Sequence, residues 1–443
     1  MHIETLGHAS LYLTDSSNRS ILITDPWLIG STYWRSWWLQ HYPTENELKK
    51  IYNSEFVYIT HQHSDHFHLP SLKKFSKKIN LLIPDLPDKT LYNFLNTQDF
   101  NHQIIKKNKW RKINSDHSIS LLSVPLWNDD SILIIDTIDA TIINLNDAKP
   151  PKFILKKLGK FVKNNKKKSI LLSSYSPASI VNSFRVDKEI LSIKSKNDYV
   201  FYLNKICDEI KPDIFMPFAS QAIFQRKDST WANEFKVTFD DLQNGWDTKK
   251  TKLVPCYSKI DLKDFSIKSL EKVNYNKRTP QIINNKVKQQ IDEEEKYDFS
   301  DKDIEILETK IKKVNFFINI FFRNGIGFKV EKKNLIYKKK KIYEITENNK
   351  NLILNGDFII EVPGLVLKDV LKNGYFGDLG ITMFTLIHTK KGLDPRLVYL
   401  FFILIGLDDY GHTKSIIRTI IWASKQLYNY MSFFIKPVKF YSK

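Results

Sequence analysis

Cysteine is scarce in this sequence, whose 443 residues include 2 of them, Cys207 and Cys256. Two thiols cannot build a disulfide framework, a zinc ribbon or a Rieske centre, so these classes are excluded. Long apolar runs are missing as well, since the longest one, 397–405, is too short to cross a bilayer. No basic segment followed by an apolar run stands at the start, and we expect no signal peptide. These absences together predict a soluble cytoplasmic protein.

Acidic residues are in the minority: 68 Lys and Arg stand against 49 Asp and Glu, and the formal charge is +19. The basic residues occur in short scattered runs, such as 166–168 and 338–341, without the sequence motifs of nucleic-acid-binding modules. We therefore predict solvated lysine-rich faces and no specific nucleic-acid partner. A positive field of this size would still attract a small anionic substrate.

The length predicts two hydrophobic cores, for which 42% apolar and 13% aromatic residues are sufficient. Residues 1–260 mix short β-forming runs with helical spacing and predict a layered α+β domain. Residues 261–443 differ in composition and predict a smaller C-terminal α+β module of unknown role. Strands are expected at 3–6, 10–14, 20–24, 56–60, 81–84, 118–124, 131–136, 140–145, 169–172, 213–217, 329–331, 342–344, 352–354 and 358–362, and helices at 69–75, 153–162, 199–210, 365–371 and over most of 395–435.

The strongest motif is His61-Gln62-His63-Ser64-Asp65-His66, which follows the predicted strand 56–60 directly. The chain has 11 histidines, so three of them within six positions indicate a function. Two imidazoles two residues apart on an extended segment point to one side, and His61 and His63 can therefore grip one metal ion. Asp65 and His66 can present an oxygen and a nitrogen to a second ion. Asp65 can alternatively orient a water molecule and take its proton, as a catalytic residue.

This H-x-H-x-D-H loop resembles the signature of the metallo-β-lactamase superfamily. Residues 7–10 (Gly-His-Ala-Ser) and 23–27 (Ile-Thr-Asp-Pro-Trp) resemble the branch that contains ascorbate-6-phosphate lactonase. Residues 144–147, 175–179 and 217–220 look more like the metallo-β-lactamase-like portion of CMP-N-acetylneuraminate hydroxylase. The resemblance covers about residues 1–247. It implies an αββα sandwich with metal ions at one edge of the two sheets, and it carries over no Rieske domain.

The resemblance also implies further site residues. By position it makes Asp147, after the strand 140–145, the carboxylate that bridges two metal ions. It places His8 and Asp25 at strand ends beside the metal site, as ligands or as residues that support ligands. A structural role in capping a turn is the competing interpretation of these two residues.

The sequence departs from the family pattern in its histidines. The position of the family's third ligand reads Trp127-Asn128-Asp129-Asp130, in which Asn128 and Asp129 offer oxygen ligands. The late histidine ligand is missing unless His388 or His412 reaches over from the C-terminal module. One or two Zn²⁺ ions remain the expected cofactor, while a single oxygen-preferring ion such as iron or manganese, or a degenerate site, stays open.

Two arginines are candidates for substrate binding. Arg35 lies among the tryptophans 27, 34, 37 and 38, where an aromatic loop could hold a sugar ring or clamp a phosphate. Arg185 follows the segment 175–179 and is a similar candidate. Core packing is the alternative for the tryptophans.

The sequence thus favours a metal-dependent hydrolase that uses an activated water molecule on an anionic ester, lactone, sugar phosphate or nucleotide sugar. A non-hydrolytic metalloprotein of sugar or surface-polysaccharide biosynthesis, such as an oxygenase component, is the first alternative. A binding or scaffold protein with a degenerate site is the second. The helical segment 414–439 interleaves apolar and basic residues and could pack on its own module, touch a membrane surface or dock a partner protein.

Overall fold

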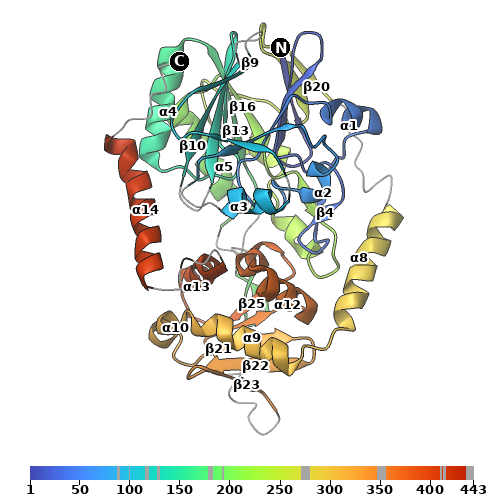
Figure 1. Ribbon diagram of the computed structural model, residues 1–443, viewed down its shortest axis with the longest axis vertical. Coiled ribbons are helices and arrows are strands. Elements are labelled where there is room, and N and C mark those ends of the chain that lie inside the picture. Colours follow the sequence, from blue (N-terminus) through green and yellow to red (C-terminus); the bar gives the residue numbers. More distant parts are fainter. Residues whose placement is uncertain are drawn as a thin grey trace.

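The computed structural model describes residues 1–86, 90–98, 100–114, 119–126, 130–177, 183–191, 194–270, 280–346, 356–409, 412 and 416–435. Figure 1 shows two modules along the long axis of the molecule. We call residues 1–177 and 194–270 the sandwich, and residues 280–409 together with 183–191 the C-terminal module.

Two sheets form the centre of the sandwich. In the described part of the chain, the first sheet has eight strands, in the order β20 (Ile267–Ser269), β19 (Ser258–Asp261), β1 (His2–Leu6), β2 (Ser10–Thr14), β3 (Ser20–Thr24), β6 (Phe56–Tyr58), β7 (Asn80–Pro84) and β8 (His102–Ile105). The second has seven among the same residues: β18 (Lys252–Leu253), β16 (Ile214–Phe218), β13 (Lys168–Ser174), β12 (Ala140–Asn144), β11 (Ser131–Asp136), β10 (Ile119–Pro125) and β9 (Arg111–Asn114). The strands expected within residues 1–260 are therefore present.

Helices cover both outer faces of the paired sheets, and this confirms the predicted αββα sandwich. The first sheet carries α1 (Glu45–Ile51), α2 (Leu69–Leu72) and α3 (Thr90–Thr97), and the second carries α4 (Lys152–Asn165), α5 (Lys196–Ile210) and α6 (Phe239–Gly245). In α4, Ile154, Leu158 and Phe161 recur at helical spacing and are buried against the second sheet. A third apolar cluster, which includes Ile3, Leu13 and Ile142, fills the space between the sheets.

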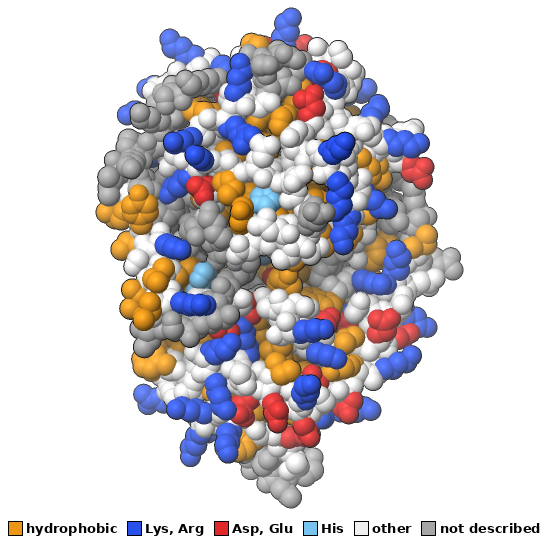
Figure 2. Space-filling model, in the orientation of Figure 1, with side chains coloured by type: hydrophobic (Ala, Val, Ile, Leu, Met, Phe, Trp, Pro, Cys, Tyr) orange, Lys and Arg blue, Asp and Glu red, His pale blue; other side chains and the backbone are white. Residues whose placement is uncertain are grey.

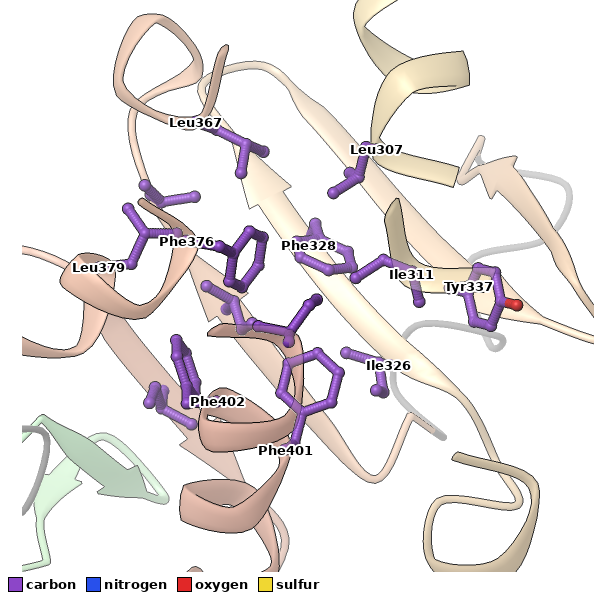
Figure 3. Close-up of a cluster of buried hydrophobic side chains, with 14 of the residues drawn as sticks. Leu307, Ile311, Ile326, Phe328, Tyr337, Leu367, Phe376, Leu379, Phe401 and Phe402 are labelled. Atoms are coloured by element: carbon purple, nitrogen blue, oxygen red, sulfur yellow. The ribbon is translucent and has the colours of Figure 1, made fainter. Parts of the chain in front are cut away.

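The C-terminal module is an α+β unit around its own sheet. Its described strands follow the order β15 (Glu189–Ile190), β14 (Phe184–Val186), β25 (Leu386–Thr389), β24 (Phe358–Glu361), β21 (Ile326–Val330), β22 (Lys333–Lys338) and β23 (Lys341–Glu344). The helical elements are α8 (Pro280–Glu295), α9 (Asp301–Lys312), α10 (Asn315–Phe321), α12 (Gly364–Asn373), the 3₁₀ turn η5 (Phe376–Ile381) and α13 (Pro395–Asp409). Figure 3 shows the aromatic core that they share, with Phe328, Phe376 and Phe401 at its centre.

One strand pair belongs to this module although it comes from the middle of the chain. β14 pairs in parallel with β25, and Phe184 lies in the core of the C-terminal module. The pair precedes the predicted division at residue 260. The expected strand 352–354 lies outside the described residues.

A buried ion pair joins the two modules. A small sheet of β17 (Ala222–Phe224), β5 (Trp37–Leu39) and β4 (Ser31–Thr32) projects from the sandwich, next to the 3₁₀ helix η3 (Thr230–Phe235). Beside it, both terminal nitrogens of Arg226 donate to the carboxylate of Glu294 on α8, each at 2.7 Å. The guanidinium also lies 3.9 Å from the ring centre of Phe384. Because Arg226 and Glu294 are both almost completely buried, neither charge can exchange its partner for water.

The last helix, α14 (Ile416–Ile435), runs along the side of the molecule and is drawn in red in Figure 1. Its buried residue Gln426 and its partly buried residues Thr419 and Trp422 lie three or four positions apart and mark the inner face. Among the described residues, no helix is both long enough and apolar enough to span a membrane.

The Arg226–Glu294 pair predicts a large stability effect. Replacing Arg226 by Ala leaves Glu294 buried without its partner, which should cost about 3–5 kcal/mol of unfolding free energy in urea denaturation. Arg19→Ala is the matched control, because Arg19 pairs with Asp15 at 3.1 Å but is 54% exposed. The control should cost less than about 1 kcal/mol. Equal losses in the two variants would contradict a structural role for the buried pair.

Candidate metal centre

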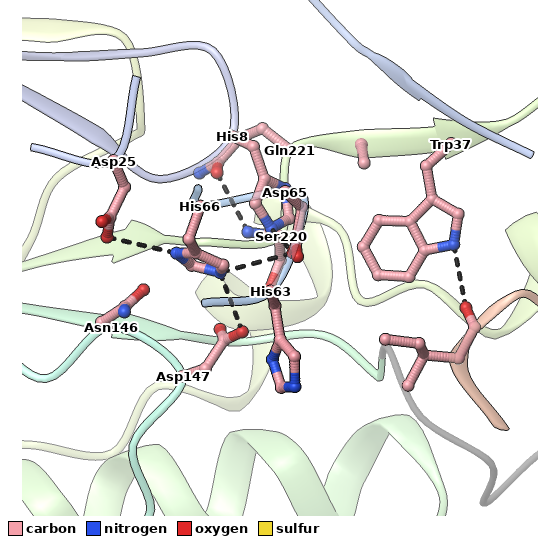
Figure 4. Close-up of polar contacts among 12 residues, drawn as sticks. His8, Asp25, Trp37, His63, Asp65, His66, Asn146, Asp147, Ser220 and Gln221 are labelled. Atoms are coloured by element: carbon pink, nitrogen blue, oxygen red, sulfur yellow. Dashed lines mark hydrogen bonds and ion pairs between the residues drawn. The ribbon is translucent and has the colours of Figure 1, made fainter. Parts of the chain in front are cut away.

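Strand ends assemble the centre at one edge of the sandwich. β3 and β6 are parallel neighbours, so the residues that follow them, Asp25 and the loop 60–66, emerge at the same edge. Asp147 follows β12 in the second sheet, and His8 lies in the turn between β1 and β2. Figure 4 shows these side chains pointing toward one another.

The turn that carries His8 is tied directly to Asp25. The Ser10 hydroxyl donates to the backbone carbonyl of Asp25 at 2.8 Å. Gly7 adopts a φ of +54°, and a Cβ at this position would lie 2.6 Å from the backbone oxygen of Trp27. A side chain cannot be accommodated there, which explains the glycine. The two short segments that suggested a branch of the superfamily are therefore neighbours in space.

His61 and His63 present nitrogens to each other. Nε2 of His61 and Nδ1 of His63 are 2.9 Å apart. On the other side of the His61 ring, Nδ1 lies 3.0 Å from the Thr60 hydroxyl, so the ring is held from behind. Burial lowers the pKa of His61 well below its usual range, with help from His66 and His63. A neutral imidazole has a free lone pair, which a metal ligand needs.

His66 lies at the centre of three carboxylates. Its Nδ1 is 3.2 Å from Asp25, and its Nε2 is 3.1 Å from Asp147 and 3.3 Å from Asp65. Burial would lower the pKa of His66, but the charges of Asp65 and Asp147 raise it well above its usual range. Asp25 also accepts from the backbone NH of Thr60 at 2.7 Å and from its hydroxyl at 2.7 Å. Asp25 therefore fixes both the ring and the loop.

Asp65 is held from two sides. One carboxylate oxygen accepts from the Tyr33 hydroxyl at 2.6 Å, and the other lies 3.2 Å from Nε2 of His8. Burial would raise the pKa of Asp65, yet His66 and His8 hold it well below its usual range. The carboxylate is therefore ionised and fixed in place.

These residues fit a divalent metal ion. Within the described residues, two groups offer ligand atoms that all lie within 4.8 Å of one another: His8, Asp65 and His66, and His61, His66 and Asp147. The buried carboxylates need positive charge nearby, and imidazole nitrogens mixed with carboxylate oxygens are a donor set that zinc, iron and manganese accept. The centre is thus a buried His/Asp cluster suited to metal binding.

Three supporting residues lie at the centre without having been assigned a role from the sequence. Tyr33 comes from a stretch with no recognisable motif, whereas Thr60 and Asn146 directly precede predicted site residues. The Asn146 amide donates to the Thr60 hydroxyl at 2.5 Å.

Asp130, which closes the segment 127–130, reaches within 3.6 Å of His61, and burial raises its pKa to about 6. Asn128 and Asp129 of that segment lie outside the described residues.

The two predicted substrate-binding arginines make other contacts. Arg35 donates to the backbone carbonyl of Lys286 on α8 at 2.7 Å. Arg185 is buried on β14, with its guanidinium 4.2 Å from the ring centre of Trp231. Both arginines thus contact neighbouring parts of the fold.

The late histidines also have other partners. His388 lies on β25, and its Nε2 is 2.6 Å from Glu361. His412 packs against Trp422 of α14. The nitrogen donor that joins the centre from elsewhere in the chain is instead His8.

Comparison with known proteins agrees with this fold. Residues 2–129 match the profile of the β-lactamase superfamily domain. Residues 2–129 of the sandwich therefore carry a β-lactamase superfamily domain, in agreement with the αββα fold.

Within the superfamily, the chain is distantly similar to the metallo-β-lactamase-like region of cytidine monophosphate-N-acetylneuraminic acid hydroxylase. It is 33% identical to the protein from Asterias rubens over 149 residues, 30% of this chain and 22% of that protein. It is 23% identical to the protein from Cricetulus griseus over 257 residues, 55% of this chain and 44% of that protein. The matches thus span less than half of either relative.

Among solved structures, the isothiocyanate hydrolase from Delia radicum gut bacteria is 13% identical. It aligns with a TM-score of 0.40 over 62% of this chain and 100% of that chain.

Asp25 should control metal affinity through His66. The change Asp25→Asn weakens the acceptor that orients the imidazole, and we expect a 10–100-fold loss of affinity, about the usual effect of such an outer partner. Competition with a chromophoric chelator measures this loss. Asp261→Asn is the matched control, since Asp261 makes a similar pair with His2 at 3.3 Å away from the cluster. Unchanged affinity in Asp25→Asn would contradict the positioning role.

Proposed function

We propose that the chain is a metal-dependent hydrolase that works at the His/Asp cluster. The facing nitrogens of His61 and His63, together with His66 between Asp65 and Asp147, are the observation that carries this proposal. His61, His63, Asp65, His66 and Asp147 would hold one or two ions. A divalent ion bound there supplies a Lewis acid that lowers the pKa of a water molecule toward neutrality.

Asp65 is the catalytic residue in this proposal. Its carboxylate is ionised and fixed by Tyr33, so it can align a water molecule and accept the proton that the water releases. The water oxygen then forms a bond to the carbonyl carbon of an ester, lactone or amide, or to the phosphorus of a phosphoester. The bond to the leaving group breaks, and the leaving group takes up a proton. His8, on the other side of Asp65, keeps the carboxylate from rotating.

The expected ion is Zn²⁺, with iron or manganese as alternatives. His8 adds an imidazole to the donors that the motif supplies, and this favours a zinc-type centre of mixed nitrogen and oxygen ligands. We further propose a substrate with an anionic reacting group, such as a sugar phosphate or nucleotide sugar. The net charge of +19 supports it, and the name of the two relatives refers to a cytidine monophosphate sugar.

Metal analysis with a paired activity assay tests the proposal. Protein purified without chelators should contain stoichiometric zinc and should hydrolyse bis(p-nitrophenyl) phosphate or p-nitrophenyl acetate. The double variant His61→Ala/His63→Ala should lose both the metal and the hydrolysis. His102→Ala is the control, because His102 lies on β8 outside the cluster and contacts Tyr92.

Two results would overturn the hydrolase proposal. Bound iron with oxygen-dependent activity and no hydrolysis would identify the alternative, an oxygenase component. The absence of stoichiometric metal from the wild-type protein would instead favour a binding or scaffold protein with a degenerate site.

A separate observation favours a second role, attachment to an anionic membrane surface through α14. The helix exposes an apolar stripe, which consists of Ile417, Ile420, Ile421, Leu427, Tyr428 and Met431. These positions recur every three, four or seven residues and lie opposite the inner face at 419, 422 and 426. An apolar stripe that points away from the protein needs an apolar environment, and the excess of lysine and arginine suits anionic head groups. Figure 2 shows these basic side chains spread over both modules on the face in view.

Vesicle co-sedimentation tests the membrane role. The full chain should bind vesicles that contain phosphatidylserine, and Ile420→Glu and Leu427→Glu should each reduce the bound fraction severalfold. Ile306→Glu is the matched control, since Ile306 is an exposed apolar residue on another helix, α9. No binding, or binding that the stripe variants leave unchanged, would overturn this role.

A further inference from the structure

A cavity of about 410 Å³ opens beside the metal centre, between the motif loop and the C-terminal module. The sandwich contributes His63 and Ser64 from the motif loop to its lining, and α3 contributes Leu91 and Phe94. The C-terminal module contributes Tyr375 and Asp378, which lie at η5. Because His63 lines the cavity and faces His61, a molecule inside it would lie next to the candidate metal ligands.

Most of the cavity wall is apolar. Phe67 and Phe94 pack edge to face, with ring centres 5.5 Å apart, and Leu91 extends the same wall. Tyr375 is 44% exposed and forms part of the opposite side. Among the described lining residues there is no lysine or arginine, and Asp378 is the one carboxylate. A wall of this kind suits an aliphatic or aromatic group and offers no counter-ion to an anion.

Asp378 is a partly buried carboxylate without a partner. Within the described part of the chain, its side chain makes no hydrogen bond or ion pair. It does lie within the electrostatic range of His63, Asp65 and Asp409. Burial raises its pKa to about 6. A carboxylate that is only partly hydrated and has no donor from the protein can gain one from a ligand, so a ligand that brings a donor gains affinity.

We infer that this cavity holds the non-reacting part of the substrate, and that this part is an apolar or aromatic group with a hydroxyl or ammonium donor for Asp378. The inference rests on the proposed hydrolase function, because the bound molecule is a substrate only if the centre is catalytic. Asp378 and Tyr375 are then specificity-determining residues, which the C-terminal module adds to a centre built by the sandwich. The anionic reacting group stays at the metal ligands, outside this cavity.

Three small ligands with one ring test the inference: benzylamine, benzyl alcohol and benzoate. Their dissociation constants can be measured by NMR titration, both in the metal-loaded protein and in the His61→Ala/His63→Ala variant, where benzoate cannot bind through a metal ion. In the double variant we expect benzylamine to bind most tightly and benzoate most weakly, and in the metal-loaded protein we expect benzylamine to bind more tightly than benzyl alcohol. The gap should be about tenfold or more, the size of one charge-assisted hydrogen bond.

Variants of the lining residues test whether the preference for benzylamine over benzoate arises in the cavity. Asp378→Asn should remove most of the difference between benzylamine and benzoate, and Tyr375→Ala should weaken all three ligands. Asp394→Asn is the matched control in the same module, since Asp394 pairs with Arg396 at the surface. Benzoate binding that equals or exceeds benzylamine binding in the double variant, or a preference that Asp378→Asn leaves intact, would overturn the inference.

The assay needs no turnover. A failed hydrolase proposal would leave the ligand preference in place, and a failed cavity would leave metal-dependent hydrolysis intact. The two failures are therefore distinguishable.

Discussion

Buried negative charge at the edge of the sandwich is the constraint on which the rest of the centre depends. Asp25 and Asp65 are almost completely inaccessible to solvent. Asp147 lies 3.1 Å from Nε2 of His66, the imidazole that also faces these two carboxylates. Such a group of carboxylates is stable only where positive charge and hydrogen-bond donors surround it. His66 meets all three carboxylates and therefore connects the two sheets, because Asp25 follows β3 and Asp147 follows β12. A divalent ion bound at this cluster would add the charge that one imidazole cannot provide alone.

The second constraint is the attachment of the C-terminal module. Arg226 and Glu294 place α8 against the sandwich, while the Trp37 indole donates to the backbone carbonyl of Ile381 at 2.9 Å. These contacts hold η5 next to the motif loop, and η5 carries Tyr375 and Asp378 to the cavity. The module thus acts on the centre by closing one side of it, in addition to the metal ligands that the sandwich supplies. A sandwich without the module would leave the apolar wall of Phe67 and Phe94 without its opposite side.

Local sequence information was sufficient for the part of the centre that lies on one loop. His61, His63, Asp65 and His66 follow a recognisable strand, and their spacing alone indicates that they converge. Asp147 and His8 required a resemblance, since one Asp after a strand and one His in a turn are common without any function. Tyr33 and Asp378 could not be predicted, because they reach the centre through tertiary contacts that leave no pattern along the chain. Tyr33 adopts a left-handed backbone conformation with a φ of +49°. Glycine and asparagine are the residues that usually indicate this conformation, and a tyrosine does not.

The two arginines that the sequence suggested for substrate binding show how a positive charge near a motif can also have structural contacts. Arg35 follows Asp25 by only ten residues, yet its side chain contacts α8, and Arg185 is buried beneath Trp231. The long-range field of +19 and the local lining of the cavity therefore act on different parts of a ligand. The field raises the local concentration of anions around the whole molecule, which is effective at distances of about a Debye length. Inside the cavity, Asp378 and the aromatic wall determine at contact distance which group binds. The carboxylate repels an anion there and accepts a hydrogen bond from a donor. An anionic reacting group joined to an apolar group that carries a hydroxyl or ammonium donor satisfies both conditions. The charge alone indicates the first part of such a substrate, and the cavity lining indicates the second.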